Sequence, residues 1–152
     1  MNNNQTGDKV EQDNSVKETD NSDFSDLGEK GENDTMNNMT ITVGNEKFTI
    51  TLYENPTTRA LVKELPMTIN MDELNGNEKL YYFSHTLPTN SEQVGSIKAG
   101  DLNLYGSDCL VLFYEGFSTP YSYTRLGYTE DATGLANALG RGSVTVKFEL
   151  KN

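Results

Sequence analysis

Residues 39–52 contain two short runs in which apolar and polar side chains alternate. The first run is Met39-Thr-Ile-Thr-Val43, the second is Phe48-Thr-Ile-Thr-Leu52, and Gly44 and Asn45 lie between them. Alternation with a period of two is typical of a strand that is buried on one face only. The sequence therefore predicts a β-hairpin whose apolar side chains all face the same side.

The pattern changes between Asn55 and Pro66, where apolar residues recur at helical spacing. Leu61 and Leu65 lie four residues apart and form one narrow apolar stripe. Asn55 is a good N-cap, Pro56 suits the first helical position, and Pro66 ends the helix. We expect a short helix that lies against a larger apolar surface.

The rest of the chain reads mainly as strands. Alternating or apolar runs predict strands within residues 67–74, 80–83, 99–106, 109–114, 121–127 and 144–150, with mostly loop at 87–100. A second short helix is predicted at residues 132–139, ended by Gly140. The run from Cys109 to Tyr114 is apolar at every position, which indicates a central strand covered on both faces. Seven or eight strands with two short helices indicate a mainly β barrel or sandwich.

The first 36 residues differ in composition from the rest. They hold ten acidic residues against three lysines, whereas residues 37–152 hold thirteen acidic against nine basic residues. The segment has few core-forming side chains, so burial cannot offset the entropy of ordering it. We predict a disordered acidic tail or tether at residues 1–36 and a folded domain at residues 37–152.

Charge and cysteine content exclude several classes of function. The net charge of −11 disfavours nucleic acids and anionic membranes, whose binding needs clustered basic residues. No apolar run approaches the length of a bilayer span, and the start Met-Asn-Asn-Asn does not read as a signal peptide. Cys109, the single cysteine, begins an apolar run and reads as a buried small side chain rather than a reactive thiol.

Several short motifs, in order, resemble the bacterial cyclophilin-like domain family over about residues 39–150. They are Asn55-Pro56-Thr57, Leu65-Pro66, Leu87-Pro88-Thr89, Ala99-Gly100-Asp101-Leu102, Leu112-Phe113-Tyr114, Ser122-Tyr123-Thr124-Arg125-Leu126-Gly127, and Leu139-Gly140 leading into Val144-Thr145-Val146. The resemblance implies a closed β-barrel of about eight strands, with the two helices plugging its ends. True cyclophilins isomerise X-Pro bonds with an arginine in an aromatic groove. Their Phe-His-Arg stretch is not found here, where the nearest segment, from Tyr82 to His85, has no arginine.

Arg125 is the strongest candidate for a functional side chain. In an extended strand Tyr121, Tyr123 and Arg125 share one face. Tyrosines beside a guanidinium hold it by cation–π contact and leave its donors free for a ligand carbonyl or carboxylate. The structural alternative is that Arg125 forms an ion pair with an acidic neighbour such as Asp101 and so stabilises the barrel.

Aromatic residues on the predicted strands are the second candidate set. Phe113, Tyr82 and Phe83, together with Tyr121 and Tyr123, are candidates for lining a ligand groove; the alternative is that they pack as core or cross-strand partners. His85 has no metal-ligand partner at useful spacing, and the acidic pairs Asp72-Glu73 and Glu130-Asp131 read as turn and cap residues. No metal site and no cofactor are predicted.

Three function hypotheses follow from these residues. The first is a binding domain that takes a proline-containing peptide or a small ligand in a groove near Arg125. The second is a peptidyl-prolyl isomerase with Arg125 as the electrophilic residue, and the third is a structural domain of the cell envelope. We expect a bacterial protein, in the envelope or outside the cell if residues 1–36 follow a lipid anchor, and otherwise in the cytoplasm. The ligand and the oligomeric state stay open.

Overall fold

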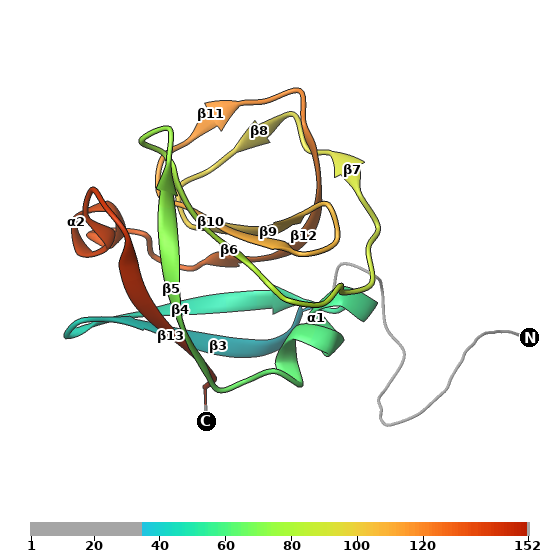
Figure 1. Cartoon of the computed structure of the whole chain (residues 1–152), viewed down its shortest axis with the longest axis horizontal. Coiled ribbons are helices and arrows are strands. Elements are labelled where there is room, and N and C mark those ends of the chain that lie inside the picture. The colour runs from blue at the N-terminus through green and yellow to red at the C-terminus, as the bar shows by residue number, and fades with distance from the viewer. Residues whose placement is uncertain (1–34, 152) are drawn as a thin grey trace, which may run out of the picture. The chain divides into compact units, whose positions relative to one another are not determined.

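The computed structural model describes residues 35–151, which form a closed antiparallel β-barrel (Figure 1). The strands are β3 (Thr35–Val43), β4 (Glu46–Tyr53), β5 (Met67–Leu74), β6 (Glu78–Tyr82), β7 (Glu92–Gln93), β8 (Ser96–Ile97), β9 (Asp101–Tyr105), β10 (Cys109–Phe113), β11 (Phe117–Ser118), β12 (Ser122–Thr129) and β13 (Val144–Leu150). The helices are α1 (Pro56–Val62) and α2 (Leu135–Leu139). Most of the predicted acidic tail, residues 1–34, lies outside the described residues.

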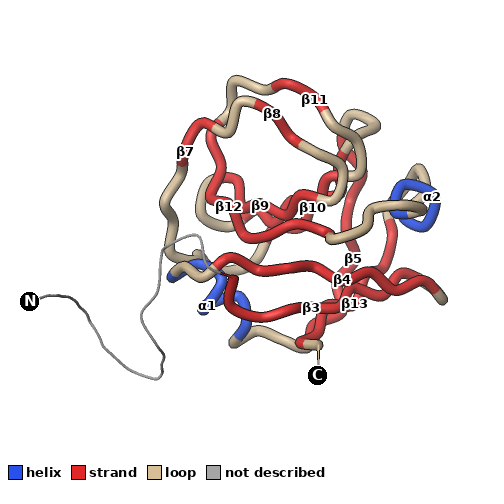
Figure 2. The backbone as a smooth tube through the Cα atoms, turned by 180° about the vertical axis from the view of Figure 1, so that it is seen from behind, coloured by secondary structure: helices blue, strands red, loops and turns tan. Residues whose placement is uncertain are grey.

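Eight strands make up the barrel in the order β4-β3-β13-β5-β6-β10-β9-β12, and pairing of β12 with β4 closes it. The short strand β7 pairs with β12, while β8 and β11 form a separate two-stranded ribbon. Figure 2 shows this ribbon and β7 on one side of the barrel, beyond β9, β10 and β12. The predicted closed barrel with two short helices is confirmed.

The first hairpin forms as the alternation predicts. Met39 pairs with Ile50 and Ile41 with Phe48. All apolar side chains of the hairpin that the pattern placed on one face are at most 8% exposed. They belong to the main core inside the barrel, which Leu61 of α1 and Leu135 of α2 also join. In Figures 1 and 2 the two helices lie on opposite sides of the barrel.

Strand β10 is buried on both faces, as its apolar run predicts. Leu110 and Leu112 belong to the main core, whereas Cys109, Val111 and Phe113 belong to a second cluster on the other face. Ile97 of β8 covers that second cluster, and Phe117 of β11 packs against it. The ribbon β8–β11 therefore supplies the outer cover of this strand.

Both helices are shorter than predicted. Helix α1 ends at Val62, because Leu65 precedes a proline and such a residue disfavours the helical backbone conformation. The amides of Glu64 and Leu65 instead donate to carbonyls three residues earlier, as in a 3₁₀ turn. Helix α2 begins only at Leu135, because Gly134 has a φ of 83° and cannot lie inside a right-handed helix.

Candidate functional site

The outer face of four neighbouring strands, β6, β10, β9 and β12, holds most of the predicted site residues. Directly opposed residues of antiparallel strands share a face. Tyr82, Cys109 and Tyr105 form one such row across β6, β10 and β9. The next row on the same face runs from Val111 to Asn103, which in turn pairs with Arg125 on β12.

Five aromatic rings form a continuous series on this outer face. The ring of Tyr105 lies 6.0 Å from Tyr121 and 5.6 Å from Tyr123, measured between centroids. Phe113 lies 5.6 Å from Tyr123 and 5.7 Å from Phe117. The structure thus brings together three predicted residues, Tyr121, Tyr123 and Phe113.

Exposure separates these rings into two groups. Phe113 and Tyr123 are 0% and 4% exposed beneath the β8–β11 ribbon, so they pack as part of the second core cluster. Tyr82, Tyr105 and Tyr121 are 62%, 46% and 58% exposed. We call these three residues the tyrosine patch. Tyr105 was missed by the sequence reasoning, although its place after Leu102 and Leu104, which face inward, predicts an outward side chain.

Phe83 does not reach the outer face. It is 6% exposed and packs in the main core, where its ring meets Tyr81 edge-on at 5.4 Å. Tyr82 and Phe83 are neighbours in sequence, and neighbouring side chains of an extended segment point to opposite faces. The predicted groove therefore does not include both residues.

Arg125 lies at the edge of the outer face, with its side chain 38% exposed. Its Nε is 3.4 Å from the Glu92 carboxylate, and its Nη2 donates to the Val94 carbonyl at 3.5 Å. Arg125 thus pairs with an acidic neighbour, as the structural alternative expects, but the partner is Glu92 and not Asp101. The sequence could not single out Glu92, because pairing of β7 with β12 is what brings that residue beside Arg125. The predicted cation–π contact with the tyrosines does not form among the described residues, where the pair Lys79 and Tyr114 makes the one such contact.

Local backbone features fix the position of Arg125. The register between β12 and β9 shifts between Arg125 and Gly127, which marks a β-bulge, and bulges re-aim side chains. The Asn55 side chain caps α1 by accepting from the Thr58 amide and also donates to the Arg125 carbonyl at 3.0 Å. One asparagine therefore ties the start of α1 to the strand that carries Arg125.

Three further residues of the outer face lie around Arg125: Tyr53, Tyr128 and Asp101. Tyr53 and Tyr128 have ring centroids 5.8 Å apart, and Tyr128 is 37% exposed. Burial raises the pKa of Tyr53, and the nearby Arg125 charge opposes that rise. Burial also raises the pKa of Asp101, which a hydrogen bond from the Lys98 amide and the charge of Arg125 counteract. With Glu92 and Asn103, these residues make up what we call the arginine site.

Asn103 is the arginine-site residue with an unmet hydrogen bond. It is 2% exposed, and its Nδ2 has no hydrogen-bond partner in the part of the chain that the structure describes. A buried donor without an acceptor costs about 1–3 kcal/mol. No local pattern marks Asn103, because it occupies an ordinary outward position of a predicted strand.

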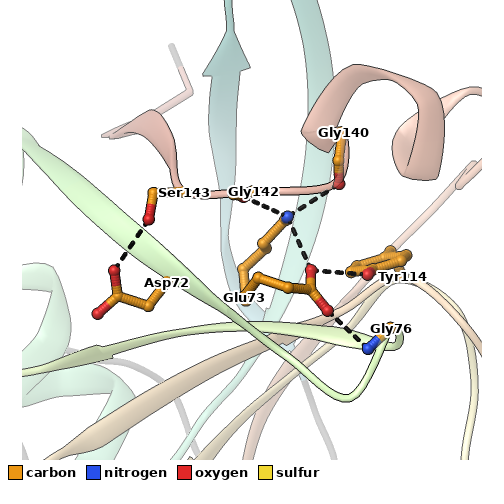
Figure 3. A network of polar contacts seen from close by, with 8 residues as sticks. Asp72, Glu73, Gly76, Tyr114, Gly140, Gly142 and Ser143 are labelled. Atoms are coloured by element: carbon orange, nitrogen blue, oxygen red, sulfur yellow. Dashed lines mark hydrogen bonds and ion pairs between the residues drawn. The ribbon is translucent and has the colours of Figure 1, made fainter.

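A second polar cluster gathers around the Lys79 ammonium, between the end of β5 and the loop after α2 (Figure 3). The fully buried Lys79 ammonium donates to Glu73 at 2.9 Å and to the carbonyls of Gly140 and Gly142 at 2.8 and 2.6 Å. The Tyr114 hydroxyl also donates to Glu73, and burial together with this carboxylate raises the pKa of Tyr114 to about 12. All three lysine donors are used, so this cluster holds the barrel end together and offers no ligand position.

The remaining candidates have local partners. His85 lies 2.9 Å from the Glu64 carboxylate at the surface. Asp72 accepts from Ser143, and Asp131 accepts from the Thr133 amide. Within residues 35–151 no three or more histidine, cysteine or acidic side chains gather in a way that could hold a metal ion. None of the described helices is long and apolar enough to cross a membrane.

Comparison with known proteins identifies the family. The model of the cyclophilin-like family matches residues 41–149, which is most of the chain. The chain belongs to the cyclophilin-like family. No curated protein matches it. The cyclophilin-like barrel is similar to the solution structure of a hypothetical protein from Archaeoglobus fulgidus, with 19% identity, a TM-score of 0.59, and coverage of 82% of this chain and 100% of the other. That likeness supports the fold.

Proposed function

We propose that this cyclophilin-like domain binds a peptide or a small amide ligand at the arginine site. The observation that carries the proposal is the pairing of Arg125 with Asn103 across β12 and β9. Arg125 is partly exposed, and Asn103 holds a buried amide donor without a described acceptor. An acceptor oxygen on a ligand can reach the exposed part of the guanidinium directly, whereas it reaches the Asn103 amide only when the side chains that cover this buried donor move aside.

The contacts that Arg125 makes leave its guanidinium available. A guanidinium has five N–H donors, and the two described contacts, at 3.4 and 3.5 Å, are longer than the usual 2.7–3.2 Å of N–H···O bonds. The Glu92 partner is 59% exposed, and ion pairs between exposed groups contribute about 0–1 kcal/mol. A ligand can therefore replace these contacts at small cost.

The local charges favour a neutral acceptor. Two carboxylates, Glu92 and Asp101, lie close to Arg125, and the Lys98 charge acts on Asp101 as well. A ligand carboxylate or phosphate would be repelled by both, whereas an amide carbonyl accepts hydrogen bonds without bringing a charge. The rings of Tyr53 and Tyr128 offer aromatic surface for an apolar side chain such as proline.

The test is an NMR titration with acetyl-Ala-Ala-Pro-Ala-amide. We expect saturable shifts at Arg125, Asn103 and Tyr128, and about a tenfold weaker Kd in Arg125→Gln, which corresponds to about 1.4 kcal/mol. The melting temperature should stay nearly unchanged because the ion pair is exposed. Arg141→Gln, in the loop after α2, is the matched control and should bind as the wild type does.

Two outcomes would overturn the proposal. The first is unchanged binding in Arg125→Gln. The second is a large loss of stability in that variant without any peptide binding by the wild type, which would support the structural envelope alternative.

Peptidyl-prolyl isomerase activity is a second candidate function, favoured by a partly exposed arginine beside two tyrosine rings. A guanidinium that bonds near the prolyl amide as its resonance is lost would lower the isomerisation barrier. In the same titration, exchange spectroscopy at the Ala–Pro bond measures the rate. Faster exchange that disappears in Arg125→Gln supports an isomerase, and unchanged exchange at high protein concentration excludes it.

A further inference from the structure

The tyrosine patch is a second exposed feature of the outer face, separate from the arginine site. Tyr82 and Tyr105 lie on either side of Cys109, whose buried side chain lies between them on the same face. Tyr121 extends the patch, with its ring 6.0 Å from that of Tyr105 at an interplanar angle of 71°. Six large apolar or aromatic side chains of the described residues are exposed, and three of them are these tyrosines. Exposed apolar side chains that are scattered singly are ordinary, whereas a cluster of them on one surface indicates an interaction site.

The acidic residue Asp108 lies beside the patch, where it acts on both Tyr82 and Cys109. The Cys109 thiol raises the pKa of Tyr82 most, followed by burial and then by the Asp108 carboxylate. Burial raises the pKa of Cys109, with Asp108 and Glu78 adding to the rise. Arg125, the cation on the same outer face, is already paired with Glu92. Asp108, next in sequence to Cys109, therefore adds a negative charge beside Tyr82.

We propose that the tyrosine patch binds the cationic side chain of an arginine or lysine in a partner peptide. Tyrosine rings present a negative π face, which attracts a cation placed over them, and Arg is the commoner partner in such contacts. The Asp108 carboxylate adds attraction for the same charge. Because neither the rings nor Asp108 belongs to the arginine site, this inference stands apart from the proposed function.

The probe is acetyl-Gly-Arg-Gly-amide, compared with the same peptide carrying citrulline. Citrulline has nearly the shape of arginine without the charge, so the pair isolates the cation. In an NMR titration the arginine peptide should give saturable shifts at Tyr82, Tyr105 and Tyr121, and the citrulline peptide should bind at least about fivefold more weakly. Equal binding of the two peptides, or shifts confined to other residues, would overturn the proposal.

Two substitutions of Tyr105 test whether the peptide is bound by the π face of the ring or only by the apolar surface area of the side chain. Tyr105→Leu should weaken binding of the arginine peptide about threefold, whereas Tyr105→Phe, which keeps a π face, should stay within about 1.5-fold of the wild type. Tyr105 is 46% exposed, so both variants should fold, which their NMR spectra check. Equal loss in both variants, or no loss in Tyr105→Leu, contradicts a cation–π contact.

Two more variants test where the positive charge of the arginine peptide is bound. Asp108→Asn should weaken binding of the arginine peptide about twofold, with a smaller effect at high salt because exposed charges are screened. Arg125→Gln should leave this binding unchanged, although it should weaken the proline-peptide binding proposed above about tenfold. Loss of arginine-peptide binding in Arg125→Gln would instead place the peptide at the arginine site and overturn a separate patch.

Discussion

The Lys79 ammonium lies 2.9 Å from the Glu73 carboxylate, with the lysine side chain 0% exposed and the glutamate side chain 23% exposed. The pair joins β6 to the end of β5, and the same ammonium holds the loop after α2 through two carbonyls (Figure 3). Burial alone would raise the pKa of Glu73, but hydrogen bonds from Lys79, Tyr114 and Gly76 lower it. The buried charge is therefore fully paired.

Lys79→Met should destabilise the domain by about 3 kcal/mol, because breaking a buried ion pair from one side leaves its partners unsatisfied. Here the Gly140 and Gly142 carbonyls lose their donor. Lys147→Met is the control, since Lys147 is 48% exposed and lies 3.6 Å from Glu149. Urea denaturation measures both variants. Similar losses in the two would contradict the structural role of Lys79.

Glu78→Gln should raise the melting temperature by a few degrees near pH 7. Glu78 is 8% exposed, and burial first, then Glu73, raises its pKa above 4.5. The folded state thus favours the protonated carboxyl, so this group's stabilising effect is present below pH 4.5 and is lost as the pH rises through the folded pKa. The gain from glutamine should shrink near pH 4. The exposed Glu115→Gln serves as the control, and a gain that does not depend on pH would contradict this account.

The fold was largely predictable because its main signals are local. Alternation at Met39, Ile41 and Val43 encodes a one-sided strand, and the unbroken apolar run of β10 encodes a strand covered on both faces. The helix bounds were less predictable. Gly134 adopts a left-handed conformation that only the folded chain reveals, and it removes the first residues of the predicted second helix.

The candidate site was predictable only within single strands. Tyr121, Tyr123 and Arg125 lie on β12 or just before its start, so their spacing predicted a shared face, although the predicted contact between Arg125 and the tyrosines does not form among the described residues. Asn103 reaches Arg125 because β9 pairs with β12, and Glu92 does so through β7. Such contacts depend on strand order, which no local pattern specifies.

Gly127→Ala should destabilise the domain by about 3 kcal/mol, because a Cβ atom there would lie 2.3 Å from the Thr51 carbonyl oxygen. The obstacle is backbone of β4 at the seam that closes the barrel, so it cannot move aside as a side chain could. Gly142→Ala is the control, since a Cβ there meets nothing within 4 Å. Urea midpoints compare the two, and equal stability would mean that the seam is looser than the structure shows.

Asn55→Ala should cost about 2 kcal/mol, because it removes both a helix N-cap and a donor to the strand that carries Arg125. The side chain accepts from the Thr58 amide at 2.8 Å and donates to the Arg125 carbonyl at 3.0 Å. Asn55→Asp keeps the capping oxygen and loses only the donor, so it should retain about half of that stability. Its amide shifts should nevertheless change from Arg125 to Gly127. If both variants lose the same stability and leave those amides unchanged, Asn55 acts as a cap alone and does not position Arg125.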